Sequence, residues 1–261
     1  MTIWKHELRT GRVSLLVWFG AIALLLAVCI LIYPEMAGQM EEMSETFSQM
    51  GGFSQAFGMD RLNFGEFIGF FGVECGNVLG LGGALFAALT GIMALSKEEK
   101  EHTAEFLLTH PVSRQRVVAE KLCAVWTQIV LLNAGTAVVT VLCIAAIGES
   151  PDGRTMALLF LAYFLMQTEI AAICFGISAF LGRGGTGVGL GLAAVLYFLN
   201  IIANLTEQAQ FLKYVTPFGY TESADIIAEG SLEGRYLAVG ILFALAGVSA
   251  AFIRYVRKDI A

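Results

Sequence analysis

The sequence predicts an all-α membrane protein with six transmembrane helices, and its composition is the first reason. Of its 261 residues, 57% are hydrophobic and 15% are charged, and the mean hydropathy is +0.72. Soluble globular domains are more charged and less apolar than this. A helix of about 20 apolar residues crosses the roughly 30 Å hydrocarbon core of a bilayer. Six stretches approach or exceed that length: 13–33, 73–95, 121–147, 156–181, 187–205 and 236–253.

The division of basic residues between the loops is the second reason, and it sets the orientation. With a cytoplasmic N-terminus, twelve basic residues lie on the inner side and four on the outer side. The twelve are Lys5, Arg9, Arg12, Lys97, Lys100, Arg114, Arg116, Lys121, Arg183, Arg254, Arg257 and Lys258; the four are Arg61, Arg154, Lys213 and Arg235. Cytoplasmic loops of membrane proteins are enriched in Lys and Arg, so this bias predicts a plasma-membrane protein with both termini in the cytoplasm.

The N-terminal region begins like a secretory signal peptide, because Lys5, Arg9 and Arg12 precede an apolar run. That run is too long for a signal peptide and no small-x-small cleavage site follows it, so we expect a retained helix. Within residues 2–12, an apolar pair one turn apart lies opposite the basic residues. This spacing predicts an interfacial helix on the inner leaflet, with a cytoplasmic extension of the first span as the alternative.

Two long external segments, 34–72 and 206–235, precede the second and the sixth spans. The first contains a methionine-rich stripe at helical spacing, formed by Met36, Met40, Met43, Phe47 and Met50. We expect this stripe to pack as an amphipathic helix over the outer mouth rather than to bind copper. The second contains a Thr-Pro-Phe-Gly-Tyr turn at 216–220 and then an amphipathic stretch with Glu222, Asp225 and Glu229. It predicts a structured acidic loop.

The cysteine and histidine residues predict neither a disulfide framework nor a metal site. The five cysteines lie singly within or at the ends of apolar stretches, without CxxC spacing, so we expect small buried hydrophobic side chains. All three histidines, His6, His102 and His110, lie outside the predicted spans. An intramembrane enzyme with a Ser-His dyad, a haem or a His-rich metal site is therefore unsupported.

Small residues recur at four-residue intervals along the second span, at Gly72, Gly76, Gly80 and Ala84. Such a stripe lets another helix approach closely, and close packing is a main source of helix association in lipid. A comparable glycine cluster opens the fifth span. Both stripes predict helix packing, either within the chain or across a dimer.

Several polar residues lie inside predicted spans, where each needs a partner or a water-filled cavity. Gln167 and Glu169 lie near the middle of the fourth span, where a charged side chain costs on the order of 3 kcal/mol on insertion. Glu169 is the foremost candidate for a cargo or gating residue, with a hydrogen bond to a neighbouring helix as the alternative. Residues toward the outer ends of the second and fifth spans are predicted to line an exit or to bond neighbouring helices: Glu74, Asn77, Asn200 and Asn204.

The only long cytoplasmic loop follows the second span and reads SKEEKEHTAEFLLTHPVSRQR. Ser96 and Glu99 form a capping-box pattern and Pro111 ends the helix, which predicts a helix over 96–111. Thr103, Phe106, Leu107 and His110 share one of its faces, and Glu98, Glu101 and Glu105 share another. Such a helix is suited to a groove in a soluble partner, with a plain surface connector as the alternative. Ser113 is the predicted N-cap of the next helix.

The string EEKEHTAEFLLTHPVSRQRVVAEKL in and after this loop resembles the signature of type-2 ABC exporter permeases. The resemblance extends to the amphipathic N-terminal segment, the Ala-Phe-Gly at 56–58 and the Thr-Pro-Phe-Gly-Tyr at 216–220. It implies that 96–111 is a coupling helix on an ATPase subunit and that 206–235 dips into the outer leaflet to close the exit. The implied ATPase contacts are Glu98, Glu101, Thr103, Glu105, Phe106, Leu107, Pro111, Ser113 and Arg114. His102 departs from the glycine common at its position, with no functional consequence that we identify.

The resemblance also implies how a complex is composed. The sequence contains no GxxxxGK[ST] motif, so we expect the chain to be no enzyme and to bind no cofactor itself, with ATP and Mg²⁺ on a separate ATPase. Two permeases, identical or homologous, are expected to pair with two ATPase subunits in membrane lipid, without nucleic acid. The cargo is open among an amphipathic peptide, a lipid and a drug. The rival functions are an ATP-independent secondary transporter and a non-transporting membrane scaffold.

Overall fold

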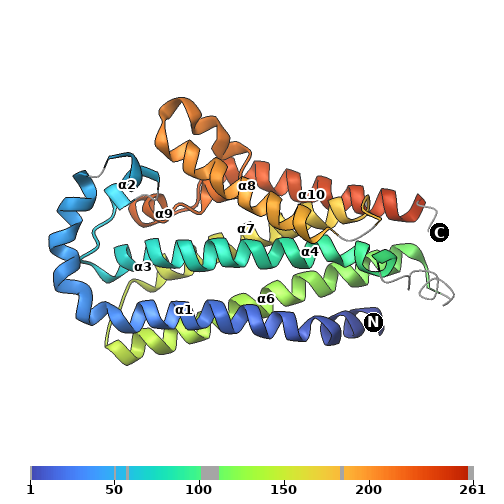
Figure 1. Cartoon of the computed structure of the whole chain (residues 1–261), viewed down its shortest axis with the longest axis horizontal. Helices are drawn as coiled ribbons and strands as arrows, with labels where there is room; N and C mark the ends of the chain where they lie inside the picture. Colours follow the sequence, from blue (N-terminus) through green and yellow to red (C-terminus); the bar gives the residue numbers. More distant parts are fainter. Residues whose placement is uncertain (1, 50, 57–58, 101–111, 183–184, 258–261) are drawn as a thin grey trace.

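The computed structural model describes residues 2–49, 51–56, 59–100, 112–182 and 185–257, with the backbone alone for 40–49, 53, 60 and 98–100. These residues form helices joined by short connections, and six helices are long and apolar enough to cross a membrane (Figure 1). The six spans are Thr2–Gln39, Phe67–Lys97, Arg114–Ile147, Gly153–Ser178, Thr186–Leu205 and Gly234–Arg257. The predicted all-α class with six spans is confirmed.

The bundle is arranged around one central helix, α7. The long helices are α1 (Thr2–Gln49), α4 (Gly82–Lys100), α6 (Arg114–Ile147), α7 (Gly153–Ser178), α8 (Thr186–Leu205) and α10 (Gly234–Arg257). α7 packs against α4, α6 and α10, whereas α1 packs mainly along α6 and α8 along α4. In the most apolar window of each span, 61% of α7 is buried, against 22% of α1 and 11% of α10. α1 and α10 thus leave apolar faces open to lipid or to another subunit.

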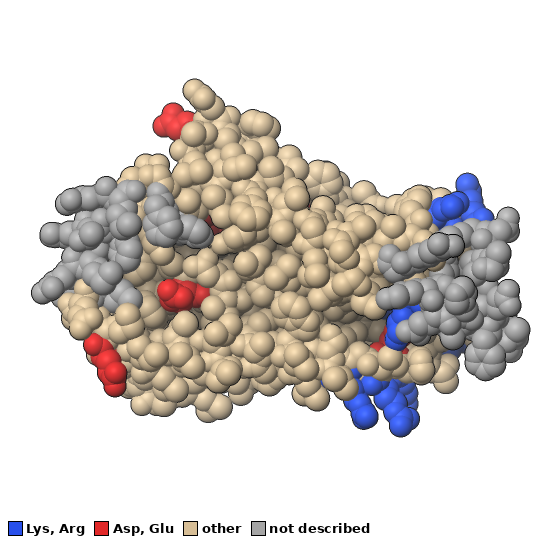
Figure 2. All heavy atoms as spheres, in the orientation of Figure 1, with Lys and Arg blue, Asp and Glu red and all other residues tan. Residues whose placement is uncertain are grey.

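Charge separates the two ends of the bundle. One end, here the basic end, carries the start of α1, the ends of α4 and α10 and the start of α6 (Figure 1). Its described basic residues are Lys5, Arg9, Arg12, Lys97, Arg114, Arg116, Lys121, Arg254 and Arg257. The opposite end, here the acidic end, carries Glu35, Glu66, Glu149, Asp152, Glu207, Glu222, Asp225, Glu229 and Glu233. On the face drawn in Figure 2, the Lys and Arg side chains gather at the basic end.

α1 is one unbroken helix, so residues 2–12 form no separate interfacial helix and continue the first span. This corrects the predicted interfacial helix in favour of the alternative, an extension of the span. The physical reason is the packing of α1 along α6, which includes the first turn: Glu120 Oε2 of α6 accepts hydrogen bonds from the backbone N–H groups of Ile3 and Trp4 at 3.0 and 3.2 Å. The first N–H groups of a helix lack partners within the helix, and Glu120 supplies one.

Ser96 lies inside α4 and does not start a new helix, which corrects the predicted capping box. Its buried hydroxyl donates to the carbonyl oxygen of Ile92, one turn back, at 2.8 Å. Extending an existing helix by a residue is favourable, whereas nucleating a new one is costly, so α4 continues through Ser96 to Lys100. Residues 101–111, most of the predicted coupling helix, lie outside the described residues.

The second span begins earlier than predicted and contains a change of helix type. α3 (Phe67–Cys75) leads into a π-helix, η2 (Gly76–Leu81), which leads into α4. A π segment is rare and widens the helical turn, and such segments occur frequently at functional sites. This one changes the register between α3 and α4 beside α7.

Short helices cover the acidic end, and one of them enters the bundle. They are α2 (Gly52–Ala56), η1 (Met59–Arg61), η3 (Glu207–Tyr214), η4 (Pro217–Tyr220) and α9 (Ser223–Glu229). η4 packs against α7, α8 and α10, with Phe218 3% and Tyr220 2% exposed. The Thr216 hydroxyl anchors this segment by donating to the carbonyl oxygen of Leu196 on α8 at 2.7 Å. The predicted acidic loop is therefore structured and reaches between the spans.

Candidate functional site

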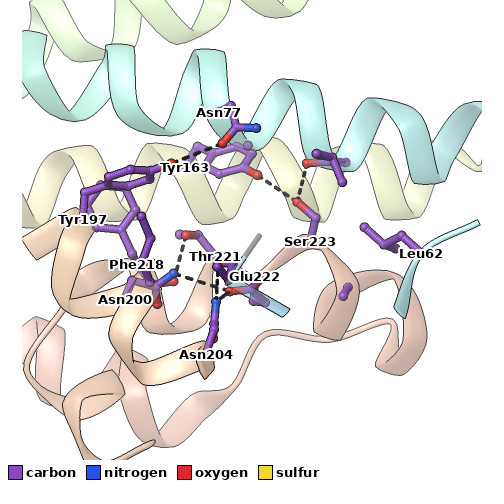
Figure 3. A pocket seen from close by; sticks show the side chains of 16 residues that line it. Leu62, Asn77, Tyr163, Tyr197, Asn200, Asn204, Phe218, Thr221, Glu222 and Ser223 are labelled. Carbon is purple, nitrogen blue, oxygen red and sulfur yellow. Dashed lines mark hydrogen bonds between the residues drawn. The ribbon is translucent and has the colours of Figure 1, made fainter. Parts of the chain in front are cut away.

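A cavity of about 60 Å³ lies near the acidic end, between the π-helix η2, the central helix α7, the C-terminal half of α8 and the η4–α9 segment (Figure 3). Three of the predicted exit residues, Asn77, Asn200 and Asn204, line it. Tyr163 and Tyr197 form aromatic walls, and the Tyr197 hydroxyl donates to Asn77 Oδ1 at 3.3 Å. The fold thus brings together polar residues that lie more than a hundred positions apart in the sequence.

Glu222 is the acidic group of this cavity, and it is 9% exposed. Its Oε2 accepts hydrogen bonds from Asn204 Nδ2 at 2.9 Å and from Asn200 Nδ2 at 3.5 Å (Figure 3). Asn204 Nδ2 also lies 3.4 Å from the carbonyl oxygen of Ala56 in α2. Sequence reasoning placed Glu222 only in an acidic loop. Nothing local in the sequence indicates that Glu222 faces inward, because an acidic residue is ordinary in that stretch.

The small-residue stripe packs within the chain in this structure, against α7 and α9. A side-chain carbon on Gly72 would lie 3.0 Å from the Ser223 Cβ, and one on Gly76 would lie 3.0 Å from the Tyr163 hydroxyl. Gly80 faces the Tyr163 ring at 3.4 Å, and Ala84 is fully buried. The Ser223 hydroxyl uses the close approach to donate to the carbonyl oxygen of Gly72 at 2.7 Å. Tyr163 then donates to Ser223 Oγ at 3.0 Å.

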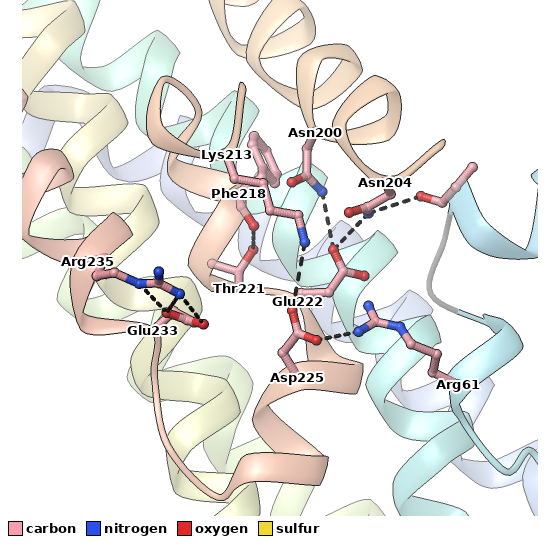
Figure 4. Close-up of polar contacts among 11 residues, drawn as sticks. Arg61, Asn200, Asn204, Lys213, Phe218, Thr221, Glu222, Asp225, Glu233 and Arg235 are labelled. Atoms are coloured by element: carbon pink, nitrogen blue, oxygen red, sulfur yellow. Dashed lines mark hydrogen bonds and ion pairs between the residues drawn. The ribbon is translucent and has the colours of Figure 1, made fainter. Parts of the chain in front are cut away.

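Ion pairs join the short helices that cover the cavity (Figure 4). Asp225 of α9 pairs with Arg61 of η1 and, at 3.8 Å, with Lys213 of η3. Glu233 and Arg235 form a further pair at 3.2 Å at the start of α10. Each partly exposed pair contributes little free energy alone, about 0–1 kcal/mol. The two pairs that share Asp225 nevertheless link three separate segments, η1, η3 and α9, at the acidic end.

A second polar cluster lies deeper, on the inward face of α7. Gln167 is fully buried and its Oε1 accepts a hydrogen bond from Asn133 Nδ2 of α6 at 2.6 Å. Its Nε2 donates to the carbonyl oxygen of Leu79 in the π-helix at 3.3 Å. Asn133 Oδ1 is buried and has no hydrogen-bond partner among the described residues. Gln167 therefore links α6, α7 and the irregular turn of the second span.

The partner of Glu169 comes from the short helix η4. The carboxylate is 4% exposed, and its Oε2 accepts a hydrogen bond from the Tyr220 hydroxyl at 2.9 Å. Gly240 of α10 allows this fit, because a side-chain carbon there would lie 2.1 Å from Glu169 Oε2. Burial, with the adjacent carboxylate as the second cause, raises the pKa of Tyr220, which keeps its hydroxyl protonated as a donor.

Glu74 does not belong to the acidic-end cavity. It lies on α3 with its Oε2 3.9 Å from the Cys29 Sγ of α1. The six predicted pathway residues therefore fall into three places: the cavity with Asn77, Asn200 and Asn204, the deeper positions of Gln167 and Glu169, and the contact of Glu74 with α1.

At the basic end, the predicted ATPase-contact residues divide between described and undescribed positions. Glu101, Thr103, Glu105, Phe106, Leu107 and Pro111 lie outside the described residues, and Glu98 is described by its backbone alone. Ser113 is the N-cap of α6, as predicted: its Oγ accepts a hydrogen bond from the backbone N–H of Arg116 at 3.3 Å. Arg114 Nη1 lies 3.5 Å from the carbonyl oxygen of Val256 near the end of α10.

A buried lysine joins three helices next to these positions. Lys121 of α6 is 1% exposed, and its Nζ donates to Glu7 Oε1 of α1 at 2.9 Å and to the carbonyl oxygen of Ala94 of α4 at 2.7 Å. A buried charge is tolerated only with such partners. From the sequence, Lys121 was expected only to be one of the basic residues on the inner side, since nothing local in the sequence indicates its burial.

No group of three or more His, Cys, Asp or Glu residues among the described positions is arranged to hold a metal ion. The described cysteines are free and lie singly, at Cys29, Cys75, Cys123, Cys143 and Cys174.

Comparison with known proteins agrees with this arrangement. Residues 1–260 match the family described as ABC-2 family transporter protein. No curated protein matches the chain. A match over nearly the entire sequence identifies the chain: it belongs to the ABC-2 transporter family, whose members are membrane transport components that associate with an ABC ATPase.

Proposed function

We propose that the chain is the membrane-spanning permease subunit of an ATP-driven ABC exporter and forms half of its translocation pathway. Family membership and the six spans support a permease. The observation that carries the proposal is the basic end, where α4 and α6 flank residues 101–111 and Lys121 ties both helices to α1. By the positive-inside rule this end faces the cytoplasm, where ATP is available.

The coupling step of the proposal runs through 96–111. In this step, residues 96–111 dock on an ATPase subunit that holds ATP and Mg²⁺. The complex contains two ATPase subunits and two permeases, identical or homologous. α4 and α6 lead from the segment into the bundle without interruption, so a displacement there is transmitted along both helices. α4 then meets α7 and α8, which carry the polar residues of the acidic-end cavity.

The acidic-end cavity is the external gate in this proposal. Glu222, Asn200 and Asn204 hold the η4–α9 segment against α8 through hydrogen bonds, which break and re-form more readily than a packed apolar contact. Separation of α8 from that segment would widen the small cavity toward the outer surface. A cargo leaving here would meet amide and carboxylate groups at the end of an apolar path, which suits an amphipathic peptide, a lipid or a drug.

Co-purification and transport measurements test the proposal. The full chain, expressed with a candidate ABC ATPase, is expected to co-purify with it, and reconstituted vesicles are expected to move an amphipathic probe only when ATP is hydrolysed. Glu105→Ala with Leu107→Ala is expected to reduce both co-purification and ATP-driven transport. Glu229→Ala, an exposed carboxylate at the acidic end, is the matched control and is expected to change neither.

Transport that persists with a hydrolysis-deficient ATPase would contradict the proposal and favour a secondary transporter. Complex formation without any movement of probe, across peptides, lipids and drugs, would favour a scaffold. Equal effects of the Glu105/Leu107 and Glu229 substitutions would remove the assigned role of 96–111.

A further inference from the structure

A second cavity, of about 220 Å³, lies at the basic end between α1, α4 and α6. Its rim is formed by exposed Ser14 of α1 and half-buried Lys97 of α4. Its inner wall is formed by α6, where Lys121 and Gln128 are buried. The cavity is far from the acidic-end gate and adjoins the start of residues 98–111.

Lys97 is the unusual member of this cavity. Its side chain is half-buried, yet among the described residues no carboxylate pairs with it. The other two charged lining residues, Lys121 and Glu7, pair with each other at 2.9 Å. The lining thus carries one net positive charge, centred on Lys97. A partly buried ammonium attracts an anion more strongly than an exposed one, because water screens it less.

The rest of the lining mixes apolar and polar side chains: Leu89, Met93 and Val125 form its apolar part, and Thr90 and the buried Gln128 lie beside them. Lys97 and Lys121 lie toward the basic end, and Leu89, Met93 and Val125 lie farther into the bundle. On α4, Leu89 and Lys97 are eight residues apart, which corresponds to about 12 Å along a helix axis. A ligand that fits has an anionic head with a short polar linker and an apolar tail, which is the chemistry of a phospholipid.

We propose that this cavity binds the phosphate headgroup of an anionic phospholipid from the leaflet at the basic end. Lys97 Nζ and the Ser14 hydroxyl are the donors to the phosphate oxygens, and Leu89, Met93 and Val125 contact the first carbons of the acyl chains. Basic pockets between transmembrane helices on the cytoplasmic side are suited to such headgroups. The proposal is independent of ATP hydrolysis and cargo, so its test does not depend on the proposed transport function.

Lipid binding to the purified, delipidated full chain in detergent tests the proposal by native mass spectrometry. Phosphatidylglycerol is expected to bind more tightly than phosphatidylcholine. Lys97→Gln is expected to weaken phosphatidylglycerol binding about fivefold, since one basic group near an anionic lipid contributes roughly 1 kcal/mol. Lys97→Arg is expected to retain most of the binding. Arg254→Gln, an exposed charge of α10 at the same end of the bundle, is the matched control and is expected to have no effect.

A second variant and a competitor make the outcome decisive. Ser14→Phe, at an exposed position that tolerates a larger side chain, is expected to narrow the cavity and reduce phosphatidylglycerol binding at unchanged apparent Tm. Equal affinity for the two lipids, or equal losses in Lys97→Gln and Arg254→Gln, would overturn the proposal. Displacement of phosphatidylglycerol by low millimolar inorganic phosphate would assign the site to a free anion and overturn the lipid assignment.

Discussion

Single polar residues inside the bundle are held by partners that lie far away in the sequence. Gln167 bonds with Asn133 and the π-helix, and Glu169 bonds with Tyr220. Each interaction satisfies a group whose unpaired burial in lipid is costly. Whether such a residue also takes part in transport is a separate property, which substitution can isolate.

Substitutions of Glu169 can separate a structural role from a role in transport, because glutamine keeps an acceptor for the Tyr220 hydroxyl and alanine does not. Glu169→Gln is expected to leave assembly and apparent Tm near wild type, and Glu169→Ala is expected to destabilise the protein by about 1–3 kcal/mol because Tyr220 loses its partner. A gating role further predicts that Glu169→Gln slows transport. Normal transport rates in both variants, at normal assembly, would remove Glu169 from the pathway.

Lys121 is expected to be the more sensitive position for stability. Lys121→Met leaves the Glu7 carboxylate and the Ala94 carbonyl without this donor, which is expected to cost about 3 kcal/mol and lower the apparent Tm. Adding Glu7→Gln is expected to recover part of the loss, because the unpaired charge is then removed. Lys5→Met, at an exposed position of α1 at the same end of the bundle, is the control. An equal loss of stability in Lys121→Met and Lys5→Met would contradict the buried-pair explanation.

Polar residues inside apolar spans are easier to single out in the sequence than polar residues outside them. Asn77, Asn200 and Asn204 stand out in hydrophobic runs, and the fold gathers them in one cavity. Glu222 and Lys121 lie in polar or mixed stretches, where charge is ordinary. Their importance arises from burial by other segments, and burial is a property of the tertiary structure that no local pattern contains.

Helix ends, too, depend on tertiary contacts that the local sequence does not contain. Ser113 lies two positions after Pro111 in the sequence and caps α6 as predicted, with an extended backbone and a hydroxyl that accepts from the Arg116 N–H. Ser96 has an equally good capping pattern, yet it follows a helix that nothing interrupts and lies inside α4. The number of spans and their centres follow from hydropathy. Their ends, the π-helix and the continuous α1 depend on contacts between elements.

The cap of α6 can be separated from the ATPase contact that the family resemblance implies for Ser113. Ser113→Ala is expected to destabilise the protein by about 1 kcal/mol, because the Arg116 N–H loses its acceptor. Ser113→Asp is expected to preserve the cap and the apparent Tm. A loss of ATPase association in both variants would indicate direct contact, whereas a loss in Ser113→Ala alone would indicate that the cap positions the loop.

The cap of α7 supplies a pH-dependent test. Asp152 accepts hydrogen bonds from the Thr155 hydroxyl and backbone N–H at 2.7 and 2.8 Å, which hold the pKa of its carboxyl below the usual range. A lowered pKa in the folded state adds stability above the unfolded value of about 4, and this stability is lost as the pH falls through the folded pKa. Asp152→Asn caps without titrating. The apparent Tm of wild type is therefore expected to fall relative to Asp152→Asn below about pH 4, and parallel curves would contradict this.

At the scale of the whole molecule, the separation of charge is the feature that connects fold and function. Both described chain ends and both flanks of residues 101–111 lie at the basic end, and the short helices η3, η4 and α9 cover the acidic end. The two ends differ in structure: helix ends and both flanks of residues 101–111 gather at the basic end, whereas short helices lie beside a polar cavity at the acidic end. The separation of charge was predictable from the composition of the loops. Successive spans cross in opposite directions, so alternate loops lie at the same end of the bundle.

The orientation that this division implies can be measured in intact cells. With Cys123, the exposed cysteine near the basic end, replaced by Ser, single cysteines are introduced at Lys5, Glu149, Glu229 and Arg257. A membrane-impermeant maleimide is expected to label Glu149→Cys and Glu229→Cys from outside, because both side chains are exposed at the acidic end. Lys5→Cys and Arg257→Cys are expected to react only after permeabilisation, since basic segments are retained in the cytoplasm. Labelling of the basic-end pair from outside would invert the topology and place 96–111 beyond the reach of any cytoplasmic ATPase.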